Sequence, residues 1–158
     1  YQQELELPLS LEKEKNETDL NLNILLKTFF IDENIEFNCE KCKSKKAKKT
    51  KKICELPEIL ILSIKKDRTV ENTKQLLINE ELKLDKYIDK ELNNINNISY
   101  KLISLINYEG NSEFGHYYSF INIQNEWYKF SDNKVTKEEN FTFMNNKAYI
   151  AYYQRIKH

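Results

Sequence analysis

His116 is the residue of this sequence best placed for proton transfer, because it is the one histidine that is not at the chain terminus. Both glycines of the chain, Gly110 and Gly115, lie within a few residues of it. Glycine permits a sharp loop, and at position 115 it leaves room for another backbone to approach, as at the mouth of a cleft. A lone histidine at the start of a strand is also a common structural or surface residue. The local pattern alone therefore leaves both roles open.

A hairpin after His116 is predicted to bring a partner to the imidazole. The strand-prone runs "GHYYSFINI" and "EWYKFSD" are separated by Gln124 and Asn125, a two-residue turn. Counting across this turn makes Ser131 a diagonal neighbour of His116 on one face, whereas Asp132 points to the other. A single bulge would exchange the two. Either residue could orient the ring, as in the base-plus-orienter pairs of nucleophilic catalysis.

Two of the three cysteines have the spacing of a metal site. Cys39 and Cys42 in "FNCEKCKS" match one half of a zinc knuckle. Zinc takes four ligands, so a second pair would come from outside this sequence; two reduced cysteines in a turn are the alternative. Cys54 in "KICELP" is expected in a buried core strand, between Ile53 and Leu56, where a thiol is a poor nucleophile.

The lysine run from Lys41 to Lys52 is predicted to be a solvated face. It holds eight lysines and no acidic residue, but it lacks the aromatic side chains on which single-stranded nucleic acid stacks. The whole chain balances 25 basic against 25 acidic residues, so no global field favours nucleic acid or anionic lipid. No apolar run reaches the length of a membrane span and no signal segment opens the chain. We expect a soluble, intracellular protein with no nucleic-acid or membrane partner.

The elements that position these residues are predicted to be mainly strands. A length of 158 residues suits about one domain, and 40% hydrophobic residues support a packed core. A helix is expected within 17–32, capped by Thr18 or Asp19, and a strand buried on both faces over 53–64. An edge strand is expected over 5–9. The C-terminal half, with runs at 115–123, 126–132 and 148–156, is predicted to be an antiparallel meander.

Five stretches together resemble one known family. In order they are "LELPLSL", "IEFNCEKCKSKKAKKTKKICELPEILILSIKK", "SYKLISLINYEG", "GHYYSFINIQNEWYKFSDNKVT" and "AYIAYYQR". The combination resembles the C-terminal part of the catalytic domain of ubiquitin-specific proteases. The resemblance implies an α+β, papain-like cysteine protease fold of the ubiquitin-specific protease type, mainly antiparallel β with few helices. Residues 1–66 would form the fingers and the entrance to the palm, with the CxxC, and 67–158 the palm with the histidine box.

The resemblance also implies roles for single residues. His116 matches the general base, and Ser131 the third triad position, where the family usually has Asp and sometimes Asn. Serine orients an imidazole without supplying a charge. Asp132 matches a second acidic position, while Cys39 and Cys42 match the second zinc pair of the fingers. That zinc would be structural, so that catalysis itself requires no cofactor.

The loop before His116 resembles a blocking loop that sits over the C-terminal tail of ubiquitin. Tyr117 would line the same channel. The ubiquitin-binding residues implied in this way are Asn111, Ser112, Glu113, Phe114 and Tyr117.

The function implied by the resemblance is that of a thiol-dependent deubiquitinase. It would hydrolyse peptide and isopeptide bonds at the C-terminal glycine of ubiquitin, with His116 as base to a cysteine in an N-terminal thumb upstream of Tyr1. Because that thumb is absent from this sequence, we expect the segment alone to be inactive and to need the N-terminal half of its own catalytic domain. A catalytically inactive ubiquitin-binding or scaffolding module is the main alternative. A zinc-knuckle protein that binds nucleic acid is a remote third.

Overall fold

A computed structural model describes residues 4–11, 20–66, 75–91, 97–111 and 113–157. An eight-stranded sheet forms the body, in the order β1-β4-β12-β7-β8-β9-β10, with β6 also paired to β7. Among the strands of this sheet, as the described residues define them, β1 pairs with β4 in parallel and all other pairs are antiparallel. The strands of this sheet are β1 (Leu7–Ser10), β4 (Ile59–Lys65), β6 (Glu81–Lys83), β7 (Ser99–Gly110), β8 (Gly115–Ile123), β9 (Glu126–Ser131), β10 (Lys134–Lys137) and β12 (Ala148–Arg155).

The core lies along the central strands β4, β12 and β7. Leu62 and Ile64 of β4, Tyr153 of β12 and Tyr100 of β7 are fully buried. Helix α1 (Leu22–Phe29) packs against β1 and buries its leucines, as its apolar spacing requires. None of the helices in the described part of the chain is long and apolar enough to cross a membrane.

The start of α1 differs from the prediction. Its N-cap is Asn21, whose side-chain Oδ1 accepts a hydrogen bond from the Ile24 N–H at 3.1 Å. Thr18 and Asp19, the predicted caps, lie outside the described residues. Leu20 is buried just before the helix rather than in it. Asn was overlooked although it caps helices as well as Asp or Ser does.

The predicted strand over 53–64 is correct only in its second half. β4 begins at Ile59, after Pro57, which has no N–H to give to a neighbouring strand. Upstream, Ile53 makes a single parallel bridge to Ile88, and Cys54 is half-buried outside the sheet. The placement of Cys54 in a buried core strand was therefore wrong.

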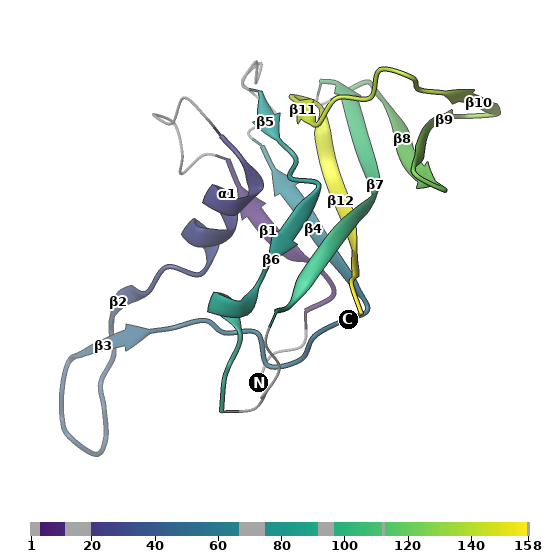
Figure 1. Ribbon diagram of the computed structural model, residues 1–158. Helices are drawn as coiled ribbons and strands as arrows, with labels where there is room; N and C mark the ends of the chain where they lie inside the picture. Colours follow the sequence, from purple (N-terminus) through teal and green to yellow (C-terminus); the bar gives the residue numbers. More distant parts are fainter. Residues whose placement is uncertain (1–3, 12–19, 67–74, 92–96, 112, 158) are drawn as a thin grey trace.

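A separate antiparallel pair of strands, β2 (Glu33–Glu36) and β3 (Lys46–Lys49), extends away from the main sheet (Figure 1). Part of the lysine run forms β3, and its three lysines are exposed, so the predicted solvated face is confirmed. Two of the three lie opposite glutamates, in the pairs Glu33–Lys49 and Glu36–Lys46. Such cross-strand pairs favour the register.

The C-terminal half is a meander only from β7 to β10. The last run, β12, returns to the middle of the sheet between β4 and β7 instead of continuing at the edge. Its buried Ala148, Ala151 and Tyr153 fit a central position. Before it, β11 (Met144–Asn145) pairs with β5 (Leu76–Leu77) in a small second sheet, and a 3-10 turn covers Asp85–Tyr87.

Candidate active site

The β8–β9 hairpin has the turn and register predicted from the sequence. Gln124 and Asn125 have φ values of +53° and +66°, as a tight two-residue hairpin turn requires. Ile123 is paired directly with Glu126, and the ladder continues in step to Ser119 and Phe130. The turn therefore fixes which residues of β9 can reach His116.

His116 and Ser131 are in contact. The imidazole Nε2 lies 2.7 Å from the Ser131 Oγ, which confirms the predicted diagonal contact. In the neutral tautomer with its proton on Nε2, the serine oxygen accepts that proton in a hydrogen bond. Nδ1 then keeps the lone pair that a general base needs. The contact thus orients an exposed imidazole whose Nδ1 could accept a proton.

Asp132 lies in the turn from β9 to β10. It is exposed and has a φ of +50°, a conformation that Asp tolerates better than most residues. Of the two residues that could have oriented the imidazole, the structure brings Ser131 into contact with it.

The two glycines are needed for different reasons. Gly110 has a φ of +148°, and a Cβ there would overlap the Phe114 carbonyl oxygen and the backbone of Gly115. A Cβ on Gly115 would overlap the ring of Tyr108. The prediction that Gly115 admits another backbone was thus wrong: Gly110 admits the backbone, and Gly115 admits an aromatic ring.

Asn111 closes the loop between β7 and β8. Its Oδ1 accepts hydrogen bonds from the N–H groups of Glu113 and Phe114, both at 2.8 Å, and its own N–H donates to the Phe114 carbonyl. The Tyr108 hydroxyl donates to the Asn111 carbonyl at 2.5 Å. These bonds hold the loop while the Phe114 side chain stays 78% exposed. Ser112 lies outside the described residues.

Tyr117 belongs to a tyrosine cluster on the face opposite to His116. Its ring centroid is 4.7 Å from that of Tyr108 and 5.5 Å from that of Tyr149. Half of its side chain is exposed. The loop and Tyr117 thus form a surface joined through Tyr108, distinct from the face that holds the His–Ser pair.

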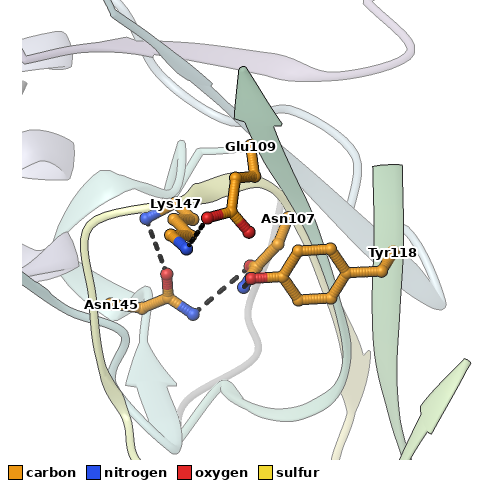
Figure 2. A network of polar contacts seen from close by, with 5 residues as sticks. All are labelled: Asn107, Glu109, Tyr118, Asn145 and Lys147. Carbon is orange, nitrogen blue, oxygen red and sulfur yellow. Dashed lines mark hydrogen bonds and ion pairs between the residues drawn. The ribbon is translucent and has the colours of Figure 1, made fainter. Parts of the chain in front are cut away.

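A polar network lies beside the hairpin and was not predicted (Figure 2). The buried Asn107 donates through Nδ2 to the Tyr118 hydroxyl at 3.2 Å and accepts through Oδ1 from Asn145 Nδ2 at 3.3 Å. Glu109 forms an ion pair with Lys147, whose backbone N–H donates to Asn145 Oδ1 at 2.7 Å. The hydrogen bond from Lys147 holds the pKa of the Glu109 carboxyl below its ordinary value.

Sequence spacing contains a signal for this network. Gly110 is paired with Gly115, and counting back from this pair places Glu109 opposite His116 and Asn107 opposite Tyr118. Counting residues across the β8–β9 turn predicted that Ser131 lies near His116. The same counting across the β7–β8 loop would have predicted Glu109 and Asn107.

Aromatic packing supports the hairpin. The ring of Trp127 on β9 stacks on Phe141 with centroids 4.0 Å apart and planes 12° apart, and Phe141 also meets Phe120 of β8 edge to face. The segment after β10 therefore covers the same face of the sheet that carries His116. A pocket of about 280 Å³ remains between this segment and Tyr118.

Cys39 and Cys42 lie on a tight turn at the tip of the β2–β3 hairpin. The Cys39 N–H donates to the Ser44 carbonyl and its carbonyl accepts from the Lys43 N–H, both at 2.9 Å. Hydrogen bonds from Cys42 lower the pKa of the Cys39 thiol, which favours the thiolate that metals bind. Within the described residues, no group of three or more His, Cys, Asp or Glu could hold a metal ion. The turn therefore fits half of a zinc site, and zinc binding stays a prediction.

Solved structures identify the class of the fold. The chain is similar to the SAGA Ubp8 DUB module bound to ubiquitin aldehyde, with a TM-score of 0.76 and 24% identity over 98% of this chain and 36% of that chain. A yeast SAGA DUB module gives the same TM-score at 22% identity, with the same coverage. The architecture is thus that of the papain-like ubiquitin-specific protease fold, mainly antiparallel β, as predicted.

Sequence comparison gives the family. The family model described as "Ubiquitin carboxyl-terminal hydrolase" matches residues 3–153, and the chain belongs to this family. It is 23% identical over 129 residues to a probable ubiquitin carboxyl-terminal hydrolase 8 of Schizosaccharomyces pombe, covering 81% of this chain and 29% of that protein. It is 27% identical over 128 residues to ubiquitin carboxyl-terminal hydrolase 9 of Arabidopsis thaliana, covering 75% and 14%. The chain thus spans less than a third of these relatives.

Proposed function

We propose that this chain supplies the histidine side of a thiol-dependent deubiquitinase active site, with His116 as general base to a cysteine outside this sequence. The contact between His116 and Ser131, in a chain that belongs to the ubiquitin carboxyl-terminal hydrolase family, carries the proposal. A similar solved structure is described as bound to ubiquitin aldehyde, which supports the C-terminal glycine of ubiquitin as the point of attack.

The proposed chemistry proceeds in two halves. His116 accepts the thiol proton, and the sulfur forms a bond to the carbonyl carbon of the ubiquitin C-terminal glycine. The tetrahedral adduct collapses, the C–N bond breaks, and the imidazolium returns its proton to the departing lysine amine. Water then attacks the thioester while His116 takes its proton, and the C–S bond breaks to release the ubiquitin carboxylate and the thiol. Ser131 keeps the ring oriented through both halves.

The loop between β7 and β8 and the tyrosine cluster around Tyr117 would contact the C-terminal tail of ubiquitin. Asn111 fixes the loop backbone, and the exposed Phe114 and half-exposed Tyr117 offer apolar surface to an extended peptide tail. Ser112 and Glu113 belong to the same loop. Asp132 supplies polar support from the turn after Ser131.

Cys39 and Cys42 would hold a structural zinc ion together with two ligands from outside this sequence. The chain would act inside the cell on ubiquitinated proteins, together with the N-terminal half of its own catalytic domain. A ubiquitin-binding scaffold without catalysis is the rival function.

Labelling of the full-length protein with a thiol-reactive ubiquitin probe separates the two. A covalent adduct is expected if the cysteine and His116 form one site. Noncovalent ubiquitin binding without an adduct would favour the scaffold.

A further inference from the structure

Strands β7, β8 and β9 present one continuous face around the imidazole of His116. On β8 this face carries His116 and Tyr118, since alternate residues of a strand point to the same side, and the two rings are nearly parallel at 20°. On β9 it carries Ser131, which contacts the imidazole, and Lys129, whose Nζ lies 4.3 Å from the Tyr118 ring centroid. The imidazole is thus bounded on this side by β9.

On the other side, the residue of β7 directly opposite His116 is Glu109. Directly opposite residues of an antiparallel pair share a face, with Cβ atoms about 4.5–5.5 Å apart. His116 therefore lies between Glu109 on one neighbouring strand and Ser131 on the other. This position follows from register and not from a turn or a mobile loop.

Lys147 fixes the Glu109 side chain. The two form an ion pair, and the backbone N–H of Lys147 donates a hydrogen bond to Asn145 Oδ1 (Figure 2). The Lys147 carbonyl also accepts a hydrogen bond from the Tyr108 N–H. The Lys147 hydrogen bond is the largest cause that lowers the pKa of Glu109, and the nearby His116 acts in the same direction. Glu109 is therefore an anion at neutral pH.

The charges around the imidazole come from several elements. In the described part of the chain they include Glu109 on β7, Lys129 on β9 and Lys147 before β12, with Asp132 following Ser131 in the turn after β9 and the Tyr118 ring on β8. Ser131 contributes a hydrogen bond but no charge. Of the two anions, Glu109 is the one placed directly opposite the imidazole by the strand register.

We propose that Glu109 is a positioning residue that supplies the negative charge which Ser131 lacks, so that the imidazolium of His116 is stabilised from the strand opposite to its hydrogen-bonding partner. The inference rests on the proposed role of His116 as general base. Two tasks that one carboxylate could perform are divided: Ser131 orients the ring, and Glu109 stabilises its charge.

The test is the replacement Glu109→Gln in the full-length protein, with the histidines labelled for NMR and the His116 signal assigned from its loss in His116→Gln. Glutamine keeps the shape and an oxygen for Lys147 but removes the charge. The imidazole should then reach half protonation at a pH about 0.3–0.6 lower than in the wild type, and the difference should shrink in 1 M salt. Turnover of a ubiquitin C-terminal fluorogenic substrate should fall about threefold.

Glu126→Gln is the matched control. Glu126 also forms an exposed ion pair, with Lys137, but it lies at the far end of the same hairpin, opposite Ile123. The same chemical change there should leave the titration of His116 unchanged. An unchanged or higher midpoint in Glu109→Gln, or equal shifts in both variants, would overturn the proposal.

The NMR readout separates this inference from the proposed function. A midpoint that shifts in a protein without ubiquitin hydrolase activity would retain the electrostatic role of Glu109 and refute the function. An active protein in which the midpoint does not move would refute the role of Glu109 alone.

Discussion

Two hairpins of this chain carry side chains suited to chemistry, and they differ in what surrounds them. The β8–β9 hairpin is part of the eight-stranded sheet, and its His116 meets Ser131 within the hairpin and Glu109 on the next strand. The β2–β3 hairpin forms a two-stranded sheet of its own, and Cys39 and Cys42 at its tip have no further ligand group among the described residues. A hairpin within a larger sheet therefore has side chains of an adjacent strand beside its own, whereas a hairpin that stands apart has only its own residues.

The largest expected difference between the two regions is in stability. Trp127→Ala should lower the free energy of unfolding by about 3 kcal/mol, because the ring stacks on Phe141 and joins β9 to the covering segment. Phe37→Ala, directly after β2, should cost under about 1 kcal/mol, since its side chain is 54% exposed. Denaturant unfolding of both variants measures this, and equal losses would contradict the comparison.

Ser131→Ala should slow turnover of a ubiquitin C-terminal fluorogenic substrate about 10-fold to 100-fold, because the imidazole loses the contact that fixes its orientation. Asp132→Ala should have a smaller effect on kcat. If Asp132→Ala is the damaging variant and Ser131→Ala is silent, then the contact seen at Ser131 does not serve catalysis.

Lys66, directly after β4, contrasts with the exposed lysines of β3. Burial lowers its pKa to about 8, and its ammonium donates to the Asn146 carbonyl at 2.6 Å. The Lys66 amine binds its proton more tightly in the unfolded chain than in the folded one. The free energy of unfolding therefore rises as the pH rises from about 8, the pKa in the folded protein, toward 10.5, the pKa of an unfolded lysine.

Lys66→Met should therefore raise the free energy of unfolding at pH 7 by about 1 kcal/mol, with the gain fading at higher pH. Lys46→Met, on the exposed β3, should be neutral throughout and serves as the control. A gain that persists unchanged at pH 10 would show that burial of the charge is not its cause.

The smallest effect on catalysis is expected at the tip of the β2–β3 hairpin. Cys39→Ser should remove about one zinc ion per full-length protein, measured by elemental analysis, and should change kcat by less than about threefold, because β2 and β3 lie far from the β8–β9 hairpin in Figure 1. Cys54→Ser, outside the turn, should keep the metal. Equal zinc content in Cys39→Ser and wild type would show that Cys39 does not bind zinc, and Cys39 and Cys42 would then be two reduced cysteines in a turn.

Much of the fold was predictable where local pattern decides it. The alternation and turn chemistry of 115–131 gave both strands, the turn at Gln124 and the reach of Ser131, because a two-residue turn fixes the register of everything after it. Family resemblance and residue counting agree at this hairpin.

One of the failed predictions depends on partners that are distant in sequence, and the others on local features that were not used. β12 takes a central place because β4 and β7 are available on either side of it, which its own aromatic pattern cannot reveal. Cys54 lies outside the sheet because β4 begins only after Pro57, although the apolar run in the sequence continues on both sides of this proline. The roles of Glu109 and Asn107 were not predicted. The loop at 111–114 was assigned to substrate contact only, although its length also sets the register between β7 and β8.

The central claim is that His116 is the base of a ubiquitin hydrolase site, and replacing it in the full-length protein tests this most directly. His116→Ala should abolish cleavage of a ubiquitin C-terminal fluorogenic substrate, with a loss of at least about 1,000-fold in kcat/KM, while ubiquitin binding and the unfolding transition remain close to those of the wild type. Retained turnover in a folded His116→Ala protein would contradict the account.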